Sequence, residues 1–323
     1  MHWIKSCLLP FAANALIVVP PSHAQTYPSK PIRLVVGFAA GGPSDVAART
    51  IAQKLSEKWG QQVIVDIRPG AGGNIATEIV AKAPADGYTL LEPAFAHAVN
   101  PFLYARLPFD AVKDFAPILL FASIANVLVV HPSIPAHSVR ELIEFAKTRP
   151  GELTCGSAGN GTASHLAVEL MNLMGGSRIT HVPYKGLAPA HTETIGGQLS
   201  MLFDGIVTGL PAVKAGRLRA LGVTTLKRWQ GAPDIPTMSE AGLAGFEVNS
   251  WYGLAAPAGT PREIVMRINT EVARALREPD ARERLYSIGA EPMDNTPEEF
   301  ASYINAEMQK WSKIVKTAGL RAD

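Results

Sequence analysis

Two periods of apolar residues alternate along the first part of the chain. Short runs rich in β-branched and aliphatic residues are typical of buried strands, and a four-residue spacing is typical of helices. In one helical segment Ala47, Ile51, Leu55 and Trp59 form a single stripe that ends before Gly60. Strict alternation of the two patterns predicts a parallel sheet covered by helices on both faces. The expected strands are 32–36, 63–66 and 88–91, with helices at 45–59 and 74–82 between them.

The same alternation starts again after an apolar run at 127–131. Ser138 and Glu141 have the spacing of a capping box at the start of a helix, and Ala163, Leu166, Leu170 and Leu173 form the stripe of another. We therefore expect a second sheet unit. Its remaining strands are expected at 153–156, 179–182, 199–203 and 218–224.

The C-terminal part is predicted to be helical. Thr260 with Glu263 and Thr296 with Glu299 have capping-box spacing, each with Pro at the first helical position. Both helices carry an apolar stripe that would cover the first unit. We therefore predict an α/β protein of two lobes, in which the chain crosses twice. Lobe 1 would comprise residues 25–125 and 227–323, and lobe 2 residues 126–226.

The N-terminus has the pattern of a secretory signal. Lys5 precedes an apolar run from Cys7 to Val19, and Ser22 and Ala24 provide small residues for cleavage after Ala24. Cleavage would remove Lys5 and change the formal charge from +2 to +1, which gives no reason to expect nucleic acid or a membrane surface as a partner. Residues 1–24 are thus expected to be a signal peptide and the mature protein to be periplasmic. Cys155 would be its single cysteine, which excludes an intrachain disulfide.

A loop of small residues, GFAAGGPSD at 37–45, joins the first strand to the first helix. Backbone N–H groups of such a loop can approach an anion, and a helix N-terminus favours negative charge. Its spacing is not the G-x-G-x-x-G of dinucleotide sites. The alternative is a tight turn in which Ser44 or Asp45 only caps the helix. The candidate ligand contacts are Phe38, Ala40, Gly41 and Ser44.

A second loop of this kind, CGSAGNGT at 155–162, occupies the matching place in the second unit. Its backbone amides and hydroxyls would suit a carboxylate, because ionised oxygens only accept hydrogen bonds. A loop that needs glycine only for close backbone approach is the alternative. The stretch at 70–74 is interpreted as a strand-to-helix turn that could also touch ligand. The candidates in the second loop are Ser157, Asn160, Gly161, Thr162 and Ser164.

Catalytic and metal sites are weakly indicated. Ser157, His165 and Asp204 could form a nucleophile, base and orienter, but their order is not that of hydrolases and Cys155 replaces the first Gly of a nucleophile elbow. A secreted serine hydrolase therefore remains a minor alternative, as does a structural or adhesive protein. The histidines lack H-x-x-x-H spacing, so neither a metal nor a cofactor is predicted.

A series of motifs resembles the solute receptors of tripartite tricarboxylate transporters, the Bug-type receptors. The series covers nearly the whole mature chain. It runs through YPSKPIR at 27–33, the GG-x-x-D loop ending at Asp45, DGYTL at 86–90, VPYKG at 182–186, and WYGL at 251–254 with PAGTP at 257–261.

This resemblance implies a non-enzymatic, monomeric Venus-flytrap receptor of type II-like fold, which closes on a small carboxylate and delivers it to the transporter's membrane subunits. The carboxylate could be a dicarboxylate, a tricarboxylate, an amino acid or an aromatic acid. By the same resemblance, Asp204 would face the cleft with Tyr184 nearby. The segment EPAFAH at 92–97 replaces a loop that is usually small and polar in the family. His97 is therefore a candidate contact, and Phe95 would either stack on the ligand or pack beneath the loop.

Overall fold

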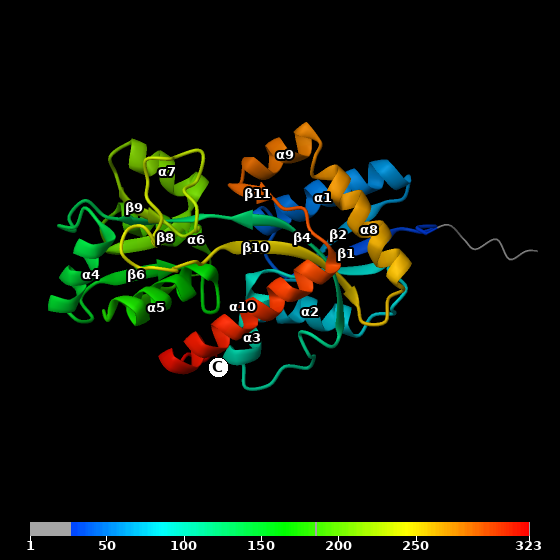
Figure 1. The fold of residues 1–323 in the computed structure, drawn as a ribbon, viewed down its shortest axis with the longest axis horizontal. Coiled ribbons are helices and arrows are strands. Elements are labelled where there is room, and N and C mark those ends of the chain that lie inside the picture. Colours follow the sequence, from blue (N-terminus) through cyan, green and yellow to red (C-terminus); the bar gives the residue numbers. More distant parts are fainter. Residues whose placement is uncertain (1–26, 185, 323) are drawn as a thin grey trace, which may run out of the picture.

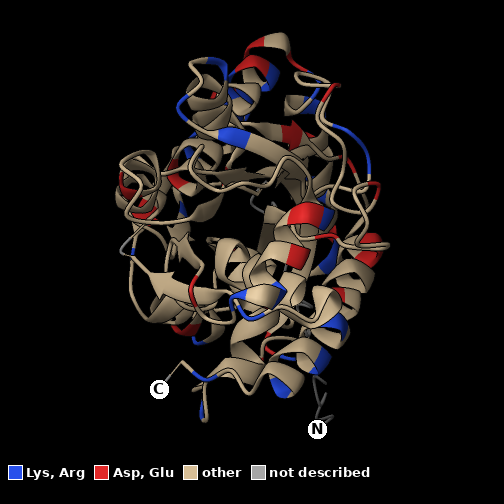
Figure 2. Cartoon of the chain, turned by 90° about the vertical axis from the view of Figure 1, so that its left-hand side faces the viewer, with Lys and Arg blue, Asp and Glu red and all other residues tan. Residues whose placement is uncertain are grey.

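The computed structural model describes residues 27–184 and 186–322. They form two sheets that lie side by side along the long axis (Figure 1). The predicted signal peptide and its cleavage site lie outside the described residues. Basic and acidic residues are both spread over the chain (Figure 2), and the formal net charge of the full sequence is +2. Within the described part, no helix has the length and apolar character needed to cross a membrane.

The first sheet has six strands in the order β11-β4-β10-β3-β1-β2. The three strands nearest the N-terminus are parallel, as the alternating pattern predicts. The other three strands form antiparallel pairs: β10 with β3 and with β4, and β11 with β4. The pairing of β10 with β4 extends over almost the full length of both strands. The parallel arrangement predicted for the three N-terminal strands is therefore confirmed, whereas the antiparallel half of the sheet was not predicted. The bounds are β1 Ile32–Val36, β2 Val63–Ile67, β3 Thr89–Glu92, β4 Phe115–Ile124, β10 Ser250–Pro257 and β11 Ala290–Pro292.

Helices cover both faces of this sheet. The predicted stripe of α1 (Pro43–Trp59) is buried at Ala47, Ile51 and Leu55, and packs with α8 (Arg262–Ala275) and α9 (Pro279–Tyr286). The opposite face holds α2 (Asn74–Ala81), which follows a short 3-10 turn, η1 (Ala71–Gly73). There too lie α3 (Phe95–Leu103) and the long α10 (Pro297–Ala318), which contact each other.

The two predicted capping boxes of the C-terminal helices differ in outcome. Thr296 and Glu299 form the complete reciprocal box at the start of α10. At α8 the hydroxyl of Thr260 donates instead to the carbonyl of Pro257, and no side chain caps the helix. The second box was wrong because the hydroxyl finds a nearer acceptor in the preceding strand.

The second sheet has five strands in the order β7-β6-β8-β5-β9 and is also mixed. One face packs against α4 and α5 and the other against α6 and α7. The strands are β5 Asn126–Val130, β6 Thr154–Ser157, β7 Thr180–Pro183, β8 Met201–Gly205 and β9 Arg219–Val223. The helices are α4 Val139–Thr148, α5 Ala163–Gly175, α6 Leu187–Ile195 and α7 Ile206–Lys214.

The chain passes between the sheets twice, first at the junction of β4 and β5. The second passage lies later than the sequence suggests. Residues 227–249 still pack on the second sheet: Phe246 stacks on Phe203 at 6.0 Å between ring centroids, and the Met238 amide donates to the Val223 carbonyl over 2.8 Å. The predicted return to lobe 1 at Lys227 is therefore too early. A segment without regular secondary structure gave no periodic pattern from which to assign it.

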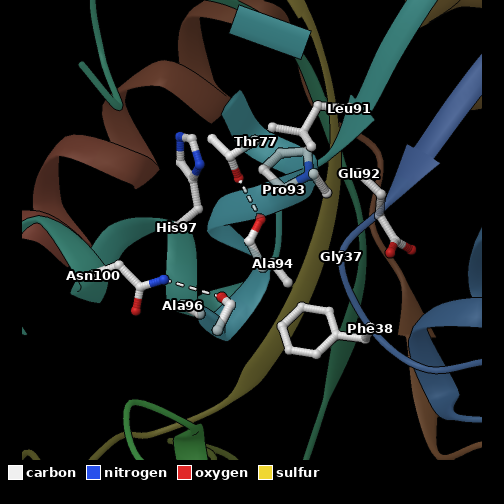
Figure 3. A pocket seen from close by; sticks show the side chains of 13 residues that line it. Gly37, Phe38, Thr77, Leu91, Glu92, Pro93, Ala94, Ala96, His97 and Asn100 are labelled. Carbon is white, nitrogen blue, oxygen red and sulfur yellow. Dashed lines mark hydrogen bonds between the residues drawn. The ribbon is translucent and has the colours of Figure 1, made fainter. Parts of the chain in front are cut away.

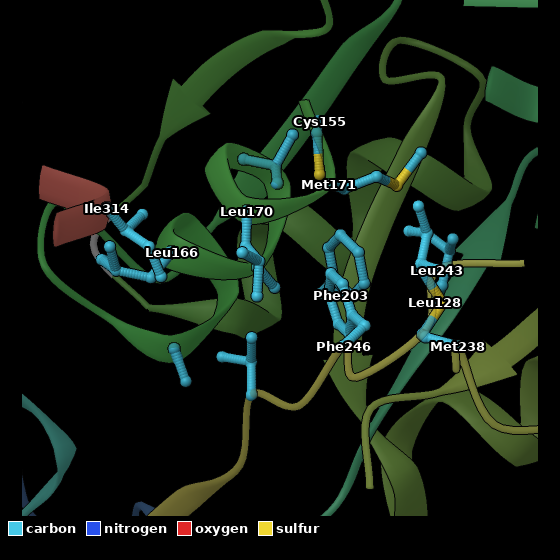
Figure 4. Close-up of a cluster of buried hydrophobic side chains, with 14 of the residues drawn as sticks. Leu128, Cys155, Leu166, Leu170, Met171, Phe203, Met238, Leu243, Phe246 and Ile314 are labelled. Atoms are coloured by element: carbon cyan, nitrogen blue, oxygen red, sulfur yellow. The ribbon is translucent and has the colours of Figure 1, made fainter. Parts of the chain in front are cut away.

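The two lobes touch through apolar side chains. Figure 4 shows Ile314, near the C-terminal end of α10, beside Leu166 and Leu170 of α5, and all three belong to one buried cluster. In Figure 1 the same half of α10 extends from the first lobe toward α5. The second lobe therefore rests on a helix that is otherwise part of the first.

Candidate functional site

The loop after β1 closes on itself before α1 begins. The amide of Gly41 donates to Asp45 Oδ2 over 2.9 Å, and Asp45 Oδ1 pairs with Arg49 Nε at 2.7 Å. Phe38 is half-buried, whereas Ala40 and Gly41 are exposed. The carboxylate of Asp45 therefore lies at the N-terminus of α1 and accepts from a loop amide. Backbone N–H groups and the helix dipole favour negative charge at this position.

Ser44 lies deeper than its neighbours and is 3% exposed. Its hydroxyl donates to a carboxyl oxygen of Glu92, the last residue of β3. The other carboxyl oxygen of Glu92 has no hydrogen-bond partner among the described residues. The pairing of Ser44 with Glu92 could not be predicted from the sequence, because only the fold brings the end of β3 beside the start of α1.

A pocket lies at the edge of the first sheet where β1 and β3 end (Figure 3). Asn100 closes one side by donating to the Gly72 carbonyl over 3.0 Å and to Asn74 Oδ1 over 2.8 Å. The wall includes Gly37, Phe38, Gly73, Thr77, Glu92, Ala94 and His97.

The structure separates the two candidates of the 92–97 segment. Phe95 is 4% exposed and packs edge-on against Trp311 with ring centroids 5.1 Å apart, so its ring is part of the core. Of the two roles considered for it, this is the packing role rather than stacking on a ligand. His97 lines the pocket, where its Nε2 donates to the Ala111 carbonyl over 2.8 Å and its Nδ1 has no partner among the described residues. Burial lowers the pKa of His97 to about 4, so the ring is neutral.

The second loop, at 157–164, is held by its own hydroxyls. Ser164 Oγ accepts from the Ala158 amide over 3.0 Å, and Thr162 Oγ1 donates to the Gly159 carbonyl over 2.7 Å. Asn160 is exposed at the tip. The loop amides are therefore held in fixed positions, with Thr162 as the residue before α5.

Gly161 brings this loop against the first lobe. A Cβ atom there would lie 2.9 Å from Leu103 Cδ1 and 3.4 Å from Asn100 Oδ1, both on α3. Gly72 approaches the same Asn100, since its Cβ would lie 3.1 Å from Nδ2. Glycine loops of both lobes therefore meet at α3.

Two stacked histidines lie behind the second loop. His165 and His181 are 3.9 Å apart between ring centroids, His165 Nδ1 accepts from the Gly161 amide over 3.1 Å, and His181 Nε2 lies 2.5 Å from Ser157 Oγ. Burial lowers the pKa of His165 to about 3 and that of His181 to about 4. The pair is therefore neutral and supports the loop through hydrogen bonds.

Asp204 was expected to face the cleft, but the structure surrounds it with protein. Asp204 is fully buried, and His191 Nδ1 lies 2.6 Å from its Oδ2. The Thr208 hydroxyl and the Gly205 amide both donate to its Oδ1, each over 2.9 Å. Burial raises the pKa of this carboxyl, against the pull of His191. Tyr184 is also engaged, because its hydroxyl donates to Glu193.

These contacts do not form the hydrolase arrangement considered from the sequence. Ser157 pairs with His181 rather than His165, and Asp204 pairs with His191. Burial also raises the pKa of the Cys155 thiol to about 12, which leaves no thiolate nucleophile at neutral pH. Within residues 27–184 and 186–322, no group of three or more His, Cys, Asp or Glu side chains is arranged to hold a metal.

Two α/β lobes joined by two crossings, with glycine-rich strand-to-helix loops that meet between them, define the class of two-lobed solute-binding proteins. The model of the tripartite tricarboxylate transporter family receptor matches residues 47–320. The chain therefore belongs to this family, whose members are periplasmic solute receptors rather than enzymes.

Individual relatives agree with this assignment. The chain is 36% identical over 313 residues to protein BugT of Bordetella pertussis, and the match covers 96% of each chain. An R. palustris structure with adipate has a TM-score of 0.81 and 42% identity, covering 91% of this chain and 99% of that one. MatC of Rhodopseudomonas palustris, with bound malate, has a TM-score of 0.78 and 33% identity, covering 90% of this chain and all of the other.

Proposed function

We propose that this receptor binds a small aliphatic dicarboxylate between its lobes and passes it to the membrane subunits of a tripartite tricarboxylate transporter. The observation that carries the proposal is the similarity over nine-tenths of the chain to a structure with adipate, together with that to MatC with malate. Such a ligand presents two groups that only accept hydrogen bonds, and the chain offers a glycine-rich loop in each lobe.

The same proposal includes the organisation of the mature protein. The signal peptide at 1–24 would direct it to the periplasm, where it would act as a monomer. The first lobe would comprise residues 27–125 and 250–322, and the second lobe residues 126–249, with hinges at the two passages between the sheets. Val248 supports this placement of the second passage, because its carbonyl accepts from the Asn126 side-chain amide over 3.5 Å and its amide donates to the Thr224 carbonyl over 3.2 Å.

In the candidate site, Phe38, Ala40, Gly41 and Ser44 would form the first-lobe side, and residues 157–164 the second-lobe side. Ligand contacts with both lobes would favour the closed state by their differential affinity for it. Asp204 would not contact the ligand directly. It would position the partly exposed side chain of His191, whose Nδ1 lies against its carboxyl group.

A thermal-shift screen of the protein from Gln25 onward tests the function. Adipate, malate and a panel of aromatic and tricarboxylic acids would be compared at equal excess. A ligand at 100 times its dissociation constant adds about 2.7 kcal/mol to the unfolding free energy. We expect the largest shift from an aliphatic diacid, reduced in Thr162→Ala and in Asp204→Ala.

The controls separate binding from folding. Thr148→Ala removes an exposed hydroxyl that donates to the Phe145 carbonyl on α4, away from both loops, and should leave the shift unchanged. Flat curves for every acid, with protein that is folded and free of co-purified ligand, would rule out the carboxylate proposal.

A further inference from the structure

Glu92 combines deep burial with an incomplete set of hydrogen bonds. It is 2% exposed at the end of β3, pairs in register with Val36, and lines the pocket beside Phe38 and Ala94. Figure 3 shows its carboxyl group near Gly37, where the loop to α1 begins. Oε2 accepts from the Ser44 hydroxyl, whereas Oε1 has no partner among the described residues. A buried polar atom without a partner at a pocket wall leaves a place for one hydrogen-bonding group.

The described groups that face this carboxyl group are acidic or neutral. From α1, Asp45 adds a second negative charge that is itself paired with Arg49. From β10 the neutral phenol of Tyr252 faces it, and His97 of α3 lines the same pocket in its neutral form. Among residues 27–184 and 186–322, Glu92 forms no salt bridge with a basic side chain. An ionised carboxylate in such surroundings is strongly disfavoured over the neutral acid.

We propose that Glu92 is a specificity-determining residue that contacts the ligand as a neutral acid, donating the proton on Oε1 to a carboxylate oxygen of the ligand. This inference rests on the proposed function and deepens it by assigning one contact. A neutral acid and a carboxylate form a strong charge-assisted hydrogen bond, whereas two carboxylates repel each other. Glu92 would thus select ligands that bring an ionised acceptor to the first lobe.

The proposal makes ligand binding depend on pH with a defined sign. Burial, reinforced by the charge of Asp45, raises the pKa of Glu92 well above its usual range, against the hydrogen bond from Ser44. Because the protonated form binds, affinity is full below that pKa and falls above it. The loss reaches about tenfold per pH unit at high pH, since one proton is linked to binding.

Isothermal titration calorimetry with adipate and with malate, from about pH 6.5 to about pH 9, would measure this linkage in a range where both carboxyl groups of each ligand are ionised. We expect the wild-type affinity to fall with rising pH as described. Glu92→Gln keeps a hydrogen-bond donor that does not titrate, so its affinity should stay constant over the range. Ser44→Ala removes the hydrogen bond that lowers the pKa, so the decline should move to higher pH.

Glu169→Gln is the matched control. Glu169 is a half-buried carboxyl on α5 in the other lobe, and burial raises its pKa too. This variant should keep the wild-type pH profile. A Glu92→Gln profile that follows the wild type, or a wild-type affinity that rises with pH, would overturn the proposal; the second result would point to an ionised Glu92 that binds a ligand ammonium group.

An infrared measurement separates failure of this inference from failure of the proposed function. The spectrum of wild-type protein minus that of Glu92→Gln should contain the carbonyl band of a protonated carboxylic acid at neutral pH, without any added acid. Absence of the band overturns the inference even if diacids bind. A band with no binding of adipate or malate at any pH rejects both the ligand contact and the diacid function.

Discussion

Gly161 illustrates how one residue couples the two lobes. Its φ of 77° lies in the left-handed region, and a Cβ atom would collide with Leu103 on the other lobe. Gly161→Ala should therefore lower the unfolding free energy by about 1 to 2 kcal/mol through backbone strain, and should also weaken adipate binding by obstructing the contact with α3. Urea denaturation and calorimetry measure the two effects.

Gly216→Ala is the control that introduces the same backbone strain as Gly161→Ala without a contact to another residue. Gly216 has a φ of 69°, and nothing lies within 4 Å of the position of its Cβ. This variant should lose similar stability but keep its affinity for adipate. Equal affinities of the two variants would show that the Gly161 contact plays no part in closure.

His97 should make the protein sensitive to acid. Its pKa is lowered by burial from 6.5 to about 4, so the unfolded state binds more protons between these values. The unfolding free energy should therefore fall as pH drops from about 6.5 to about 4, with His97 contributing up to about 1.4 kcal/mol per pH unit. His97→Gln, which keeps a donor for the Ala111 carbonyl, should reduce this slope in denaturation series. The exposed substitution His137→Gln should leave it unchanged.

At the scale of elements, the start of α10 is held by a complete capping box. Thr296→Ala removes the acceptor for the Glu299 amide and should lower the unfolding free energy by about 1 kcal/mol. Ser302→Ala, on the same helix, removes a hydroxyl that donates to the Glu298 carbonyl in the helix interior, and should change stability much less. A loss in Ser302→Ala as large as in Thr296→Ala would assign the effect to helix solvation rather than to the cap.

The local sequence pattern was sufficient to predict helices that have an apolar stripe or a capping box. The stripe of α1 and the capping box of α10 were both predicted, because side-chain periodicity and cap spacing are local properties. It was insufficient for β10 and α3. Every residue of β10 from Trp251 to Pro257 is buried, so the strand has no polar alternation, and α3 carries Pro101 in its interior. The antiparallel half of the first sheet was missed for this reason.

Across the whole molecule, the sequence indicated the loops of the candidate site but not the side-chain contacts around them. Glycine-rich segments after two strands indicated where both lobes would offer backbone amides. The pairings of Ser44 with Glu92, Ser157 with His181 and Asp204 with His191 join residues from different elements. No spacing rule connects such residues, so these partners could not be predicted from the sequence, and Asp204 is more deeply buried than predicted.

Closure of the whole molecule should depend on α10, which carries apolar side chains to both lobes. Ile314 is 6% exposed beside Leu166 of the second lobe, whereas Ile304, 5% exposed, lies on the part of α10 nearer its start, beside the first sheet. Replacing either by Ala should cost about 2 to 5 kcal/mol of unfolding free energy. Only Ile314→Ala should weaken adipate binding and increase the radius of gyration in small-angle scattering with adipate present, because only it removes apolar contact between lobes. Equal losses of affinity would instead show that general destabilisation, rather than the contact between α10 and α5, controls closure.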